Sequence, residues 1–535
     1  MKDGNWLDKL RSLKEDLPGP EMALPGVRAL ISSRLMPPLN PVGVLKLSRD
    51  LLRFGPSPAI GYAPGAARHP DAVAIVEPVG AQLTFAEAED LTRRCVTGLK
   101  QRGISDADAV AILGRNTIGF ALAIPAVSRT GADLVYLNPG FRPAQIAAII
   151  QDRSVSLVLV DDDLADRIPP GTATASLPNP DTWATPEPTT GKTGSSRHII
   201  LTSGTTGKPK GADRSRTPVE SAVSLLDTLP YRERDTHVLA APMFHSWGWL
   251  NHRFTSLLDA TEVLIPRPTA AAVLDATEEH RAQIIVATPV VVARLADAGA
   301  QGRDLSALRG VLVSGSAIPA TVVRDFCDKF GPVLYNLYGS TEVGFATCAG
   351  PSDLLAAADT AGRPLPGVTV EILNSRGTQV ATGASGEIWV GSAASFDGYI
   401  DGGDKDRRAG LLSTGDLGHY DPAGRLFVSG RADDLIISGG ENVHPSEVEA
   451  VLREHPGVRD VAAVGRTDAK FGQAVLAYVV AQDPNLSDAD QQALIADLAA
   501  FSRRELAGYQ RPRDIYLRAS LPTNETGKVL RRELR

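Results

Sequence analysis

The chain has 535 residues, more than one hydrophobic core usually serves, so two or more domains are expected. Hydrophobic residues make up 43% and charged residues 22%, which is ordinary for a globular enzyme, and the net charge of −7 gives no electrostatic reason to expect nucleic-acid binding. The three cysteines lie far apart, so neither a disulfide framework nor a structural zinc site is predicted. No signal-peptide pattern and no apolar run of membrane-spanning length occurs, and a reducing cytoplasm is the predicted location.

Residues 1–55 form a proline-rich leader outside the pattern that follows. Two stretches in it carry apolar residues at helical spacing, one close to the amino terminus and one over Val42–Phe54. These stretches either pack on the main body or make a peripheral contact with the inner face of a membrane, and both interpretations stay open. The apolar residues of the first stretch are Trp6, Leu7, Leu10, Leu13 and Leu17.

From about residue 66, short β-rich runs alternate with helical patterns of ten or more residues. This alternation is typical of parallel sheets covered by helices. The first helices are predicted over Thr84–Arg102 and Thr117–Thr130. The predicted strands are Val73–Glu77, Ala109–Leu113, Asp133–Leu137, Ser156–Val160, His198–Leu201, Val238–Ala241, Glu262–Ile265, Ile284–Ala287, Gly310–Val313 and Val333–Tyr335.

The character of the chain changes after Gly350, where short strands joined by Gly, Asn and Asp turns suggest a small β-rich subdomain. A compact unit of strands and helices follows, and its first helix starts at Pro445. The predicted fold class is therefore α/β. We expect a leader over residues 1–55, a large domain of helix-covered, mostly parallel sheets with the β-rich subdomain over 56–432, and a small, mobile α+β domain over 433–535.

The segment 202–211, Thr-Ser-Gly-Thr-Thr-Gly-Lys-Pro-Lys-Gly, directly follows a predicted strand. Its glycines let backbone amides approach a ligand, its hydroxyls add donors, and Lys208 and Lys210 supply positive charge. Such a nest of donors suits an oxyanion and favours a polyphosphate. The spacing of Gly204 and Lys208 and the proline after the lysine differ from a Walker A loop. A flexible loop without a ligand is the alternative.

This segment resembles the signature of the adenylate-forming superfamily, which contains acyl-CoA synthetases, luciferases and the adenylation domains of peptide synthetases. Other family motifs follow in the same order, so the resemblance covers the chain from about residue 65 to its end. The sequence most resembles bacterial fatty-acyl-CoA ligases, notably those of mycobacteria. The resemblance implies ATP and CoA as co-substrates, Mg²⁺ as cofactor and a carboxylic acid, with a fatty acid favoured, as substrate. The implied ATP contacts in the loop are Thr202, Ser203, Gly204, Thr205, Thr206, Gly207 and Lys210.

The segment Tyr338-Gly-Ser-Thr-Glu342 offers a close backbone approach, a hydroxyl and a hard oxygen ligand of the kind that Mg²⁺ prefers. The resemblance places Thr341 on phosphate, Glu342 on Mg²⁺ and Tyr338 with Gly339 beside the adenine. Taken alone, the motif could be a turn before a helix. The family also borders the adenine with the end of an earlier strand, which here supplies Gly315, Ser316 and Ala317.

An acid and a base, Asp416 and Arg431, stand where the family binds the ribose hydroxyls. A carboxylate accepts hydrogen bonds from a diol and an arginine donates them, although isolated charges of this kind are more often surface groups. Asp433 matches the family's hinge between the two domains. Gly439 and Gly440 match glycines that line the pantetheine tunnel in related CoA ligases.

Lys528 lies in the segment Pro-Thr-Asn-Glu-Thr-Gly-Lys near the end of the chain. A lone lysine on a terminal loop is usually solvated, but the motif implies that it reaches the substrate carboxylate and the α-phosphate during adenylation. Upstream, Tyr509, Arg511 and Arg513 resemble an aromatic and basic segment that contacts the CoA nucleotide.

The acyl site is indicated by the segment 241–249, Ala-Pro-Met-Phe-His-Ser-Trp-Gly-Trp. By resemblance, His245 lies beside the substrate carboxylate and Gly339 borders the acyl pocket. Trp249 is either an aromatic gate over an acyl tunnel or a core residue. The glycines at 248 and 344 are expected to leave room for a chain.

The implied reaction joins the carboxylate to the α-phosphate of ATP with release of pyrophosphate, and CoA thiol then displaces AMP. A rotation at the hinge would withdraw Lys528 between the steps. A fatty acyl-AMP ligase that loads a carrier protein is the nearest alternative. Luciferase-type oxygenation and a non-catalytic nucleotide-binding protein are further ones. Acyl chain length and oligomeric state are left open.

Overall fold

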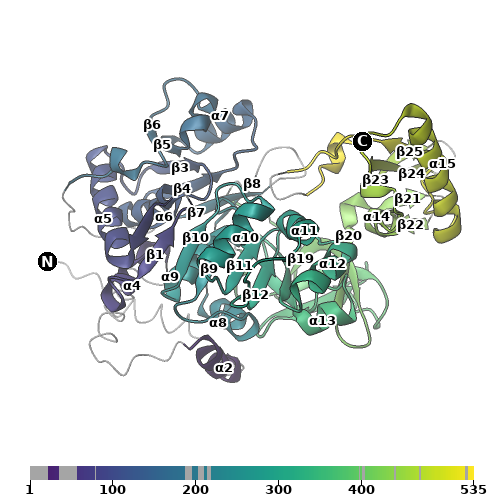
Figure 1. Cartoon of the computed structure of the whole chain (residues 1–535), viewed down its shortest axis with the longest axis horizontal. Helices are drawn as coiled ribbons and strands as arrows, with labels where there is room; N and C mark the ends of the chain where they lie inside the picture. Colours follow the sequence, from purple (N-terminus) through teal and green to yellow (C-terminus); the bar gives the residue numbers. More distant parts are fainter. Residues whose placement is uncertain are drawn as a thin grey trace.

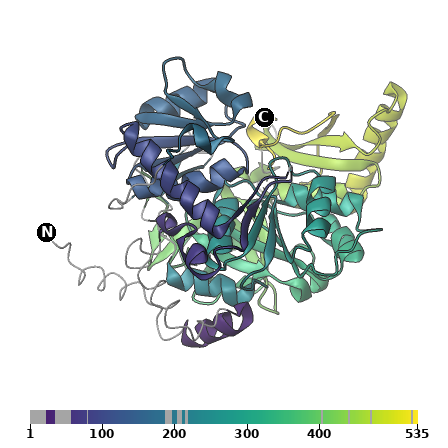
Figure 2. The ribbon, with the colours of Figure 1, turned by 60° about the vertical axis from the view of Figure 1, so that its left-hand side comes forward.

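The computed structural model describes residues 22–34, 57–78, 80–186, 196–202, 210–213, 218–396, 398–400, 404–438, 441–468, 472–524 and 528–534. They form a large body and a small lobe that begins near β21 (Ile436–Ser438) (Figure 1). The tail that ends the chain lies on the side of the small lobe that faces the large body, as a second view also shows (Figure 2). No helix among the described residues is both long and apolar enough to cross a bilayer.

A six-stranded sheet is built from the first part of the large body. Its order is β6-β5-β3-β4-β7-β8, and all neighbours are parallel except β7 and β8, which are antiparallel. The central strands are buried along most of their length, as expected where helices cover both faces of a parallel sheet. The strands are β3 (Ala109–Leu113), β4 (Asp133–Leu137), β5 (Val155–Val160), β6 (Thr174–Ser176), β7 (His198–Thr202) and β8 (Lys210–Asp213).

A nine-stranded sheet in the order β15-β14-β13-β12-β11-β9-β10-β1-β2 forms the second layer of strands. It is parallel from β13 to β1 and antiparallel at both edges. The strands are β1 (Val73–Val76), β2 (Gln82–Thr84), β9 (Thr236–Leu239), β10 (Thr261–Leu264), β11 (Ile284–Ala287), β12 (Gly310–Val313), β13 (Leu334–Ser340), β14 (Gly344–Ala349) and β15 (Arg363–Pro364).

Helices cover both sheets and fill the space between them. One continuous core joins the facing surfaces of the two sheets with α5 (Phe85–Gln101), α6 (Ile118–Thr130) and α9 (Ser246–Leu257). The other face of the nine-stranded sheet packs on α10 (Ala270–Glu279), α11 (Pro289–Ala298) and α12 (Ala320–Phe330), and that of the six-stranded sheet packs on α7 (Pro143–Asp152). The remaining helices of the large body are α2 (Ala23–Ser33), α4 (Ala63–Arg68), α8 (Val219–Thr228) and α13 (Pro351–Ala356).

A five-stranded antiparallel sheet completes the large body, with β19 paired to β17, β18 and β20. In the small lobe, β24 pairs with β21, β23 and β25; helices cover one face, and the other packs against apolar residues of the chain's last segment. The bounds are β16 (Thr369–Leu373), β17 (Gly386–Gly391), β18 (Arg407–Arg408), β19 (Leu411–Tyr420), β20 (Leu426–Arg431), β22 (Glu441–Val443), α14 (Pro445–Arg453), β23 (Val458–Asp468), β24 (Gly472–Ala481), α15 (Asp488–Glu505) and β25 (Asp514–Leu517).

The predicted α/β fold class is confirmed, with a β-rich subdomain and a small α+β lobe where the sequence indicates them. Two local differences have clear causes. Strand β13 continues through Tyr338 to Ser340 because β14 pairs with it in antiparallel register. The leader contains α2, which packs on α8 and pairs Arg28 with Asp227. The two leader stretches at residues 6–17 and 42–54 lie outside the described residues.

Candidate active site

The two ends of the predicted phosphate loop are held by a pair of strands. Thr202 ends β7 and Lys210 begins β8, and the two residues are partners in the antiparallel ladder. Within β8, Ala212 also forms a β-bridge with Tyr399, and the Ile400 amide donates to the Gly211 carbonyl at 3.0 Å. The segment 203–209, with Ser203, Gly204, Thr205, Thr206 and Gly207, lies outside the described residues.

The bridge brings Tyr399 to Glu342. The Tyr399 hydroxyl donates to Oε1 of Glu342 at 2.7 Å, and Glu342 is only 9% exposed. Burial alone would raise the pKa of Glu342, but hydrogen bonds from Tyr399 and Ser340 and the charge of Lys405 outweigh it and lower that pKa. The carboxylate is therefore ionised at neutral pH and lies close to the base of the phosphate loop.

Thr341, the neighbour of Glu342 in sequence, approaches the start of α9, where His245 lies. The Thr341 hydroxyl is 3.5 Å from the hydroxyl of Ser246, the first residue of α9. His245 is the residue before that helix, and its Nε2 atom is buried without a hydrogen-bond partner among the described residues. Burial lowers the pKa of His245 to about 4, so the ring is neutral at pH 7. An unsatisfied ring nitrogen at this place suits a polar ligand atom.

The two residues predicted to bind ribose face each other across a β-ladder. Asp416 on β19 is the direct partner of Arg431 on β20, and the guanidinium donates to its Oδ1 at 3.4 Å. The Tyr338 hydroxyl donates to Oδ2 of Asp416 at 2.7 Å. Arg431 also donates to the Asp433 carboxylate at 3.1 Å. Tyr338, Asp416, Arg431 and the predicted hinge residue therefore form one contiguous polar chain.

Lys528 approaches this chain from the small lobe. Burial raises the pKa of Asp416, and its hydrogen bond with Tyr338 and the charges of Arg431, Lys528 and Lys405 act in the opposite direction. The structure thus brings Lys528 within electrostatic reach of Asp416 although the two residues are far apart in sequence. The side chain of Lys528 is exposed.

The strand end predicted to border adenine is open. Gly315 follows β12 with a φ of +105°, and no heavy atom lies within 4 Å of the position that a Cβ would occupy there. Gly315 and Ala317 are exposed and Ser316 is half-buried. A flat ligand could therefore lie against this backbone without meeting a side chain.

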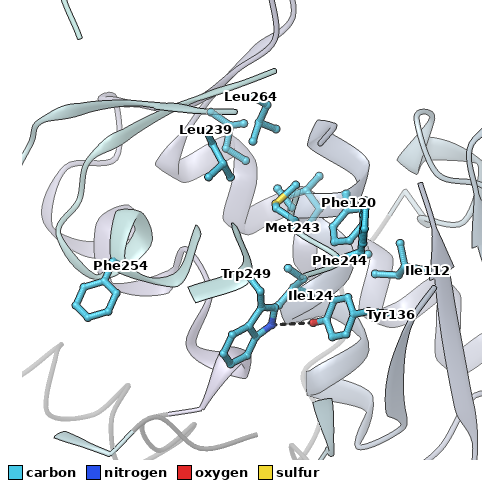
Figure 3. Close-up of a cluster of buried hydrophobic side chains, with 14 of the residues drawn as sticks. Ile112, Phe120, Ile124, Tyr136, Leu239, Met243, Phe244, Trp249, Phe254 and Leu264 are labelled. Atoms are coloured by element: carbon cyan, nitrogen blue, oxygen red, sulfur yellow. Dashed lines mark hydrogen bonds between the residues drawn. The ribbon is translucent and has the colours of Figure 1, made fainter. Parts of the chain in front are cut away.

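Trp249 does not join the polar group around Glu342. It is 3% exposed and lies in the core between the two large sheets (Figure 3). Its indole N–H donates to the Tyr136 hydroxyl at 2.9 Å, and that hydroxyl is 2.8 Å from Nδ1 of His198. Trp249 is therefore buried with its indole N–H hydrogen-bonded in this structure, and its role as an aromatic gate stays a prediction.

The expectation that two glycines leave room for an acyl chain is wrong. A Cβ at Gly248 would lie 2.2 Å from the Pro242 carbonyl oxygen, so the backbone of the preceding loop already fills that space. Gly344 has a φ of +76°, and a Cβ there would lie 2.7 Å from the Ala394 Cβ. A Cβ at Gly339 would lie 2.1 Å from the Gly344 carbonyl oxygen. These glycines permit close packing of backbone against its neighbours.

The predicted CoA residues belong to the small lobe. Arg511 donates to the Leu506 and Arg503 carbonyls at 3.0 and 2.9 Å, at the end of α15. Arg513 pairs with Asp468 at 2.5 Å, and Tyr509 is 42% exposed. Both arginines thus have structural partners in this arrangement. Gly439 and Gly440 lie outside the described residues.

Sequence reasoning did not find Tyr399 or Lys405. Tyr399 follows an Asp-Gly pair between strands, and Lys405 is an isolated lysine whose Nζ lies 3.4 Å from the Thr414 carbonyl oxygen. Both act on the candidate site through neighbours that are distant in sequence. No local pattern marks either residue.

Two family models match the chain. A family model described as AMP-binding enzyme matches residues 63–400, and one described as AMP-binding enzyme C-terminal domain matches residues 447–528. The chain belongs to the AMP-binding enzyme family. The resemblance to adenylate-forming ligases is thereby confirmed.

Three curated relatives align with this AMP-binding enzyme over most of both chains. Indoleacetate–CoA ligase of Aromatoleum aromaticum is 31% identical, over 85% of this chain and 92% of the relative. A fatty acid–[acyl-carrier-protein] ligase, ScoC, of Streptomyces coeruleorubidus is 30% identical, with the same coverage. The long-chain-fatty-acid–CoA ligase FadD13 of Mycobacterium tuberculosis is 29% identical, over 86% of this chain and 94% of the relative.

A similar solved structure is that of o-succinylbenzoate CoA synthetase (MenE) from Bacillus subtilis in complex with an acyl-adenylate intermediate. It superposes with a TM-score of 0.79 at 27% identity and covers 89% of this chain and 97% of its own. The same synthetase is also known in complex with ATP and magnesium ion.

This AMP-binding enzyme is an adenylate-forming acid–thiol ligase that uses ATP, CoA and Mg²⁺. The residues present fit magnesium, because Glu342 offers a buried, ionised carboxylate beside the ends of the phosphate loop. Mg²⁺ is held in such sites by one or two carboxylates together with phosphate oxygens and water.

Proposed function

We propose that this AMP-binding enzyme converts a fatty acid to an acyl-adenylate with release of pyrophosphate, and then transfers the acyl group to CoA with release of AMP. The relatives named for fatty-acid substrates support the choice of acid, although others are named for indoleacetate and succinylbenzoate. The observation that carries the proposal is the convergence of Tyr338, Glu342, Asp416, Arg431 and Lys528, from three separate parts of the chain, on one region.

Adenylation brings a carboxylate and a phosphate together, so the site must offset the repulsion between two anions. Lys528 supplies a positive charge that can be aimed at the carboxylate and the α-phosphate. Magnesium, held by Glu342, would neutralise charge on the phosphates. His245 is neutral at pH 7, so its Nε2, which has no partner among the described residues, can form a hydrogen bond with the carboxyl group of the substrate without adding charge to the site.

Asp416 and Arg431 are proposed to hold the ribose. One oxygen of Asp416 is fixed by Tyr338 and the other by Arg431, so the carboxylate has a single orientation toward a diol. A carboxylate with both oxygens partly occupied still has lone pairs free for hydroxyl donors. Thr341 and the loop over residues 202–210 are proposed to contact the phosphates, and residues 315–317 the adenine.

The second step needs the face that Lys528 occupies. We place the boundary between the large domain, 56–432, and the small domain, 433–535, at Asp433, with residues 1–55 as a leader. Rotation there would withdraw Lys528 and bring Gly439 and Gly440 to the thiol. The ion pair between Asp433 and Arg431 lies at this junction, so it would have to loosen when the chain turns.

Separating the two half-reactions tests these roles. Lys528→Ala should lower ATP–pyrophosphate exchange by about 10²–10³-fold, the usual cost of one preorganised donor, and still convert supplied acyl-AMP to acyl-CoA. Arg532→Ala is the matched control, because it removes an exposed positive charge from the same terminal segment and should leave both half-reactions unchanged. Equal loss of both half-reactions in Lys528→Ala would reject the assignment.

The acid is identified with a panel run from acetate to an eighteen-carbon fatty acid, with benzoate, indoleacetate and 2-succinylbenzoate, and AMP release as the readout. A preference for the aryl acids would overturn the fatty-acid proposal and leave the ligase chemistry intact. A second candidate acceptor is a carrier protein, favoured by the relative named as a fatty acid–[acyl-carrier-protein] ligase. Acyl-CoA formation with free CoA would exclude the carrier as the required acceptor.

A further inference from the structure

The two described ends of the segment that carries Lys528 are held together by their own contacts. Thr523 forms a β-bridge with Val529, and the Asn524 amide donates to the Lys528 carbonyl at 2.9 Å. The Asn524 side chain accepts from the Lys528 amide at 2.8 Å. These bonds close the loop on itself, but they do not attach it to the rest of the small lobe.

Two kinds of contact attach the carboxyl end of this segment to the small lobe: Val529 and Leu534 pack on the apolar face of β23 and β24, and, three residues after Lys528, Arg531 makes polar contacts. Its Nη2 donates to both carboxylate oxygens of Glu449, at 2.7 and 2.8 Å, and its Nε donates to the Ala463 carbonyl at 3.3 Å. Its Nη1 lies 3.8 Å from a carboxylate oxygen of Asp434. One guanidinium therefore joins helix α14, strand β23 and the residue that follows the proposed hinge.

Glu449 is itself held in place. It is 7% exposed, lies on α14 and accepts the Ala463 amide at 2.8 Å. A buried, doubly engaged carboxylate has one orientation, and a charge-assisted bond to arginine is short and directional. By contrast, Arg532 on the next position is exposed.

We propose that Arg531 is a positioning residue for adenylation: with Glu449 and Asp434 it fixes the base of the Lys528 loop relative to the hinge, so that the lysine ammonium enters the site at one depth. The inference rests on the proposed role of Lys528. A reacting group displaced by about 1 Å can cost about 10² in rate. Thioester formation takes place with Lys528 withdrawn, so it does not need this anchor.

The half-reactions therefore respond differently. In Arg531→Met we expect ATP–pyrophosphate exchange to fall about 10²-fold, while supplied acyl-AMP and CoA still react at nearly the wild-type rate. Glu449→Gln, which keeps the shape and one acceptor, should give a smaller loss of the same kind. Arg531→Lys should recover part of the exchange rate, and Arg532→Met should leave both half-reactions unchanged.

Equal loss of both half-reactions in Arg531→Met and Glu449→Gln would overturn the inference, because general damage to the small lobe does not distinguish the two steps. Unchanged exchange in Glu449→Gln and Arg531→Met would overturn it as well. If Arg531→Met does not fold, Glu449→Gln decides. Lys528→Ala is measured beside these variants. If Lys528→Ala slows both half-reactions equally, the proposed function is rejected. If Lys528→Ala slows only the exchange reaction and the Arg531 and Glu449 variants do not, only the role of Arg531 is rejected.

Discussion

Replacing Tyr399 with phenylalanine removes one hydroxyl from the carboxylate proposed to hold magnesium. That hydroxyl donates to Oε1 of Glu342 at 2.7 Å, and Glu342 is 9% exposed, so water cannot fully substitute for it. A hydrogen bond to a charged group contributes about 1.5–3 kcal/mol. Loss of this bond should therefore raise the pKa of Glu342 in Tyr399→Phe.

The sign of the pH effect follows from the direction of the shift. Hydrogen bonding holds the pKa of folded Glu342 below its ordinary value, so the stabilisation is present above that value and is lost as pH falls through the folded pKa. A raised pKa moves this loss to higher pH. The acid limb of ATP–pyrophosphate exchange should therefore shift to higher pH in Tyr399→Phe, and on that limb more Mg²⁺ should be needed for the half-maximal rate.

The matched control is Tyr420→Phe, which removes a half-buried hydroxyl of the same subdomain that donates to the neutral Val370 carbonyl at 3.2 Å. It should leave the acid limb in place. An unchanged limb and an unchanged Mg²⁺ requirement in Tyr399→Phe would refute the reasoning, and so would an equal shift in the control.

Two further changes test other parts of the molecule. Tyr136→Phe should lower the free energy of unfolding by about 2–4 kcal/mol, because the mutation removes the hydroxyl that the buried Trp249 N–H and His198 Nδ1 contact. Urea denaturation measures this change, with the exposed Tyr509→Phe as the control, and a change under about 0.5 kcal/mol would contradict the account. Asp433→Pro should preserve ATP–pyrophosphate exchange and strongly reduce acyl-CoA formation from supplied acyl-AMP, because proline fixes φ at the proposed hinge; normal overall acyl-CoA formation would remove the hinge from consideration.

The parts of the fold that the sequence predicted are those with local signals. The apolar runs of β3 and β11 and the helical spacing of apolar residues over Thr84–Arg102, where α5 lies, each act within a few residues. The extension of β13 past Tyr335 was missed because it depends on pairing with β14, which is a tertiary contact. Helix α2 was missed because prolines near it suggested an irregular leader, yet Pro25 lies in its first turn, where proline is tolerated.

The candidate site shows the same division. Asp416 and Arg431 were named from motifs, and the ladder between β19 and β20 then brings them face to face. Tyr399 was not named, because its place beside Glu342 depends on a bridge to Ala212 from another sheet. Glycine was misread at position 248, since sequence does not distinguish a glycine that faces empty space from one that faces a carbonyl oxygen.

The position of the β19–β20 ladder separates nucleotide binding from the movement of Lys528 in the proposed mechanism. Asp416 and Arg431 lie before the proposed hinge and on neighbouring strands, so a turn at Asp433 would carry neither of them away. The nucleotide would stay bound to the large body through both half-reactions, while Lys528 leaves the site. Substitutions in the last hundred residues would then alter turnover and leave the ribose contacts of the nucleotide in place, and the two properties could diverge among relatives.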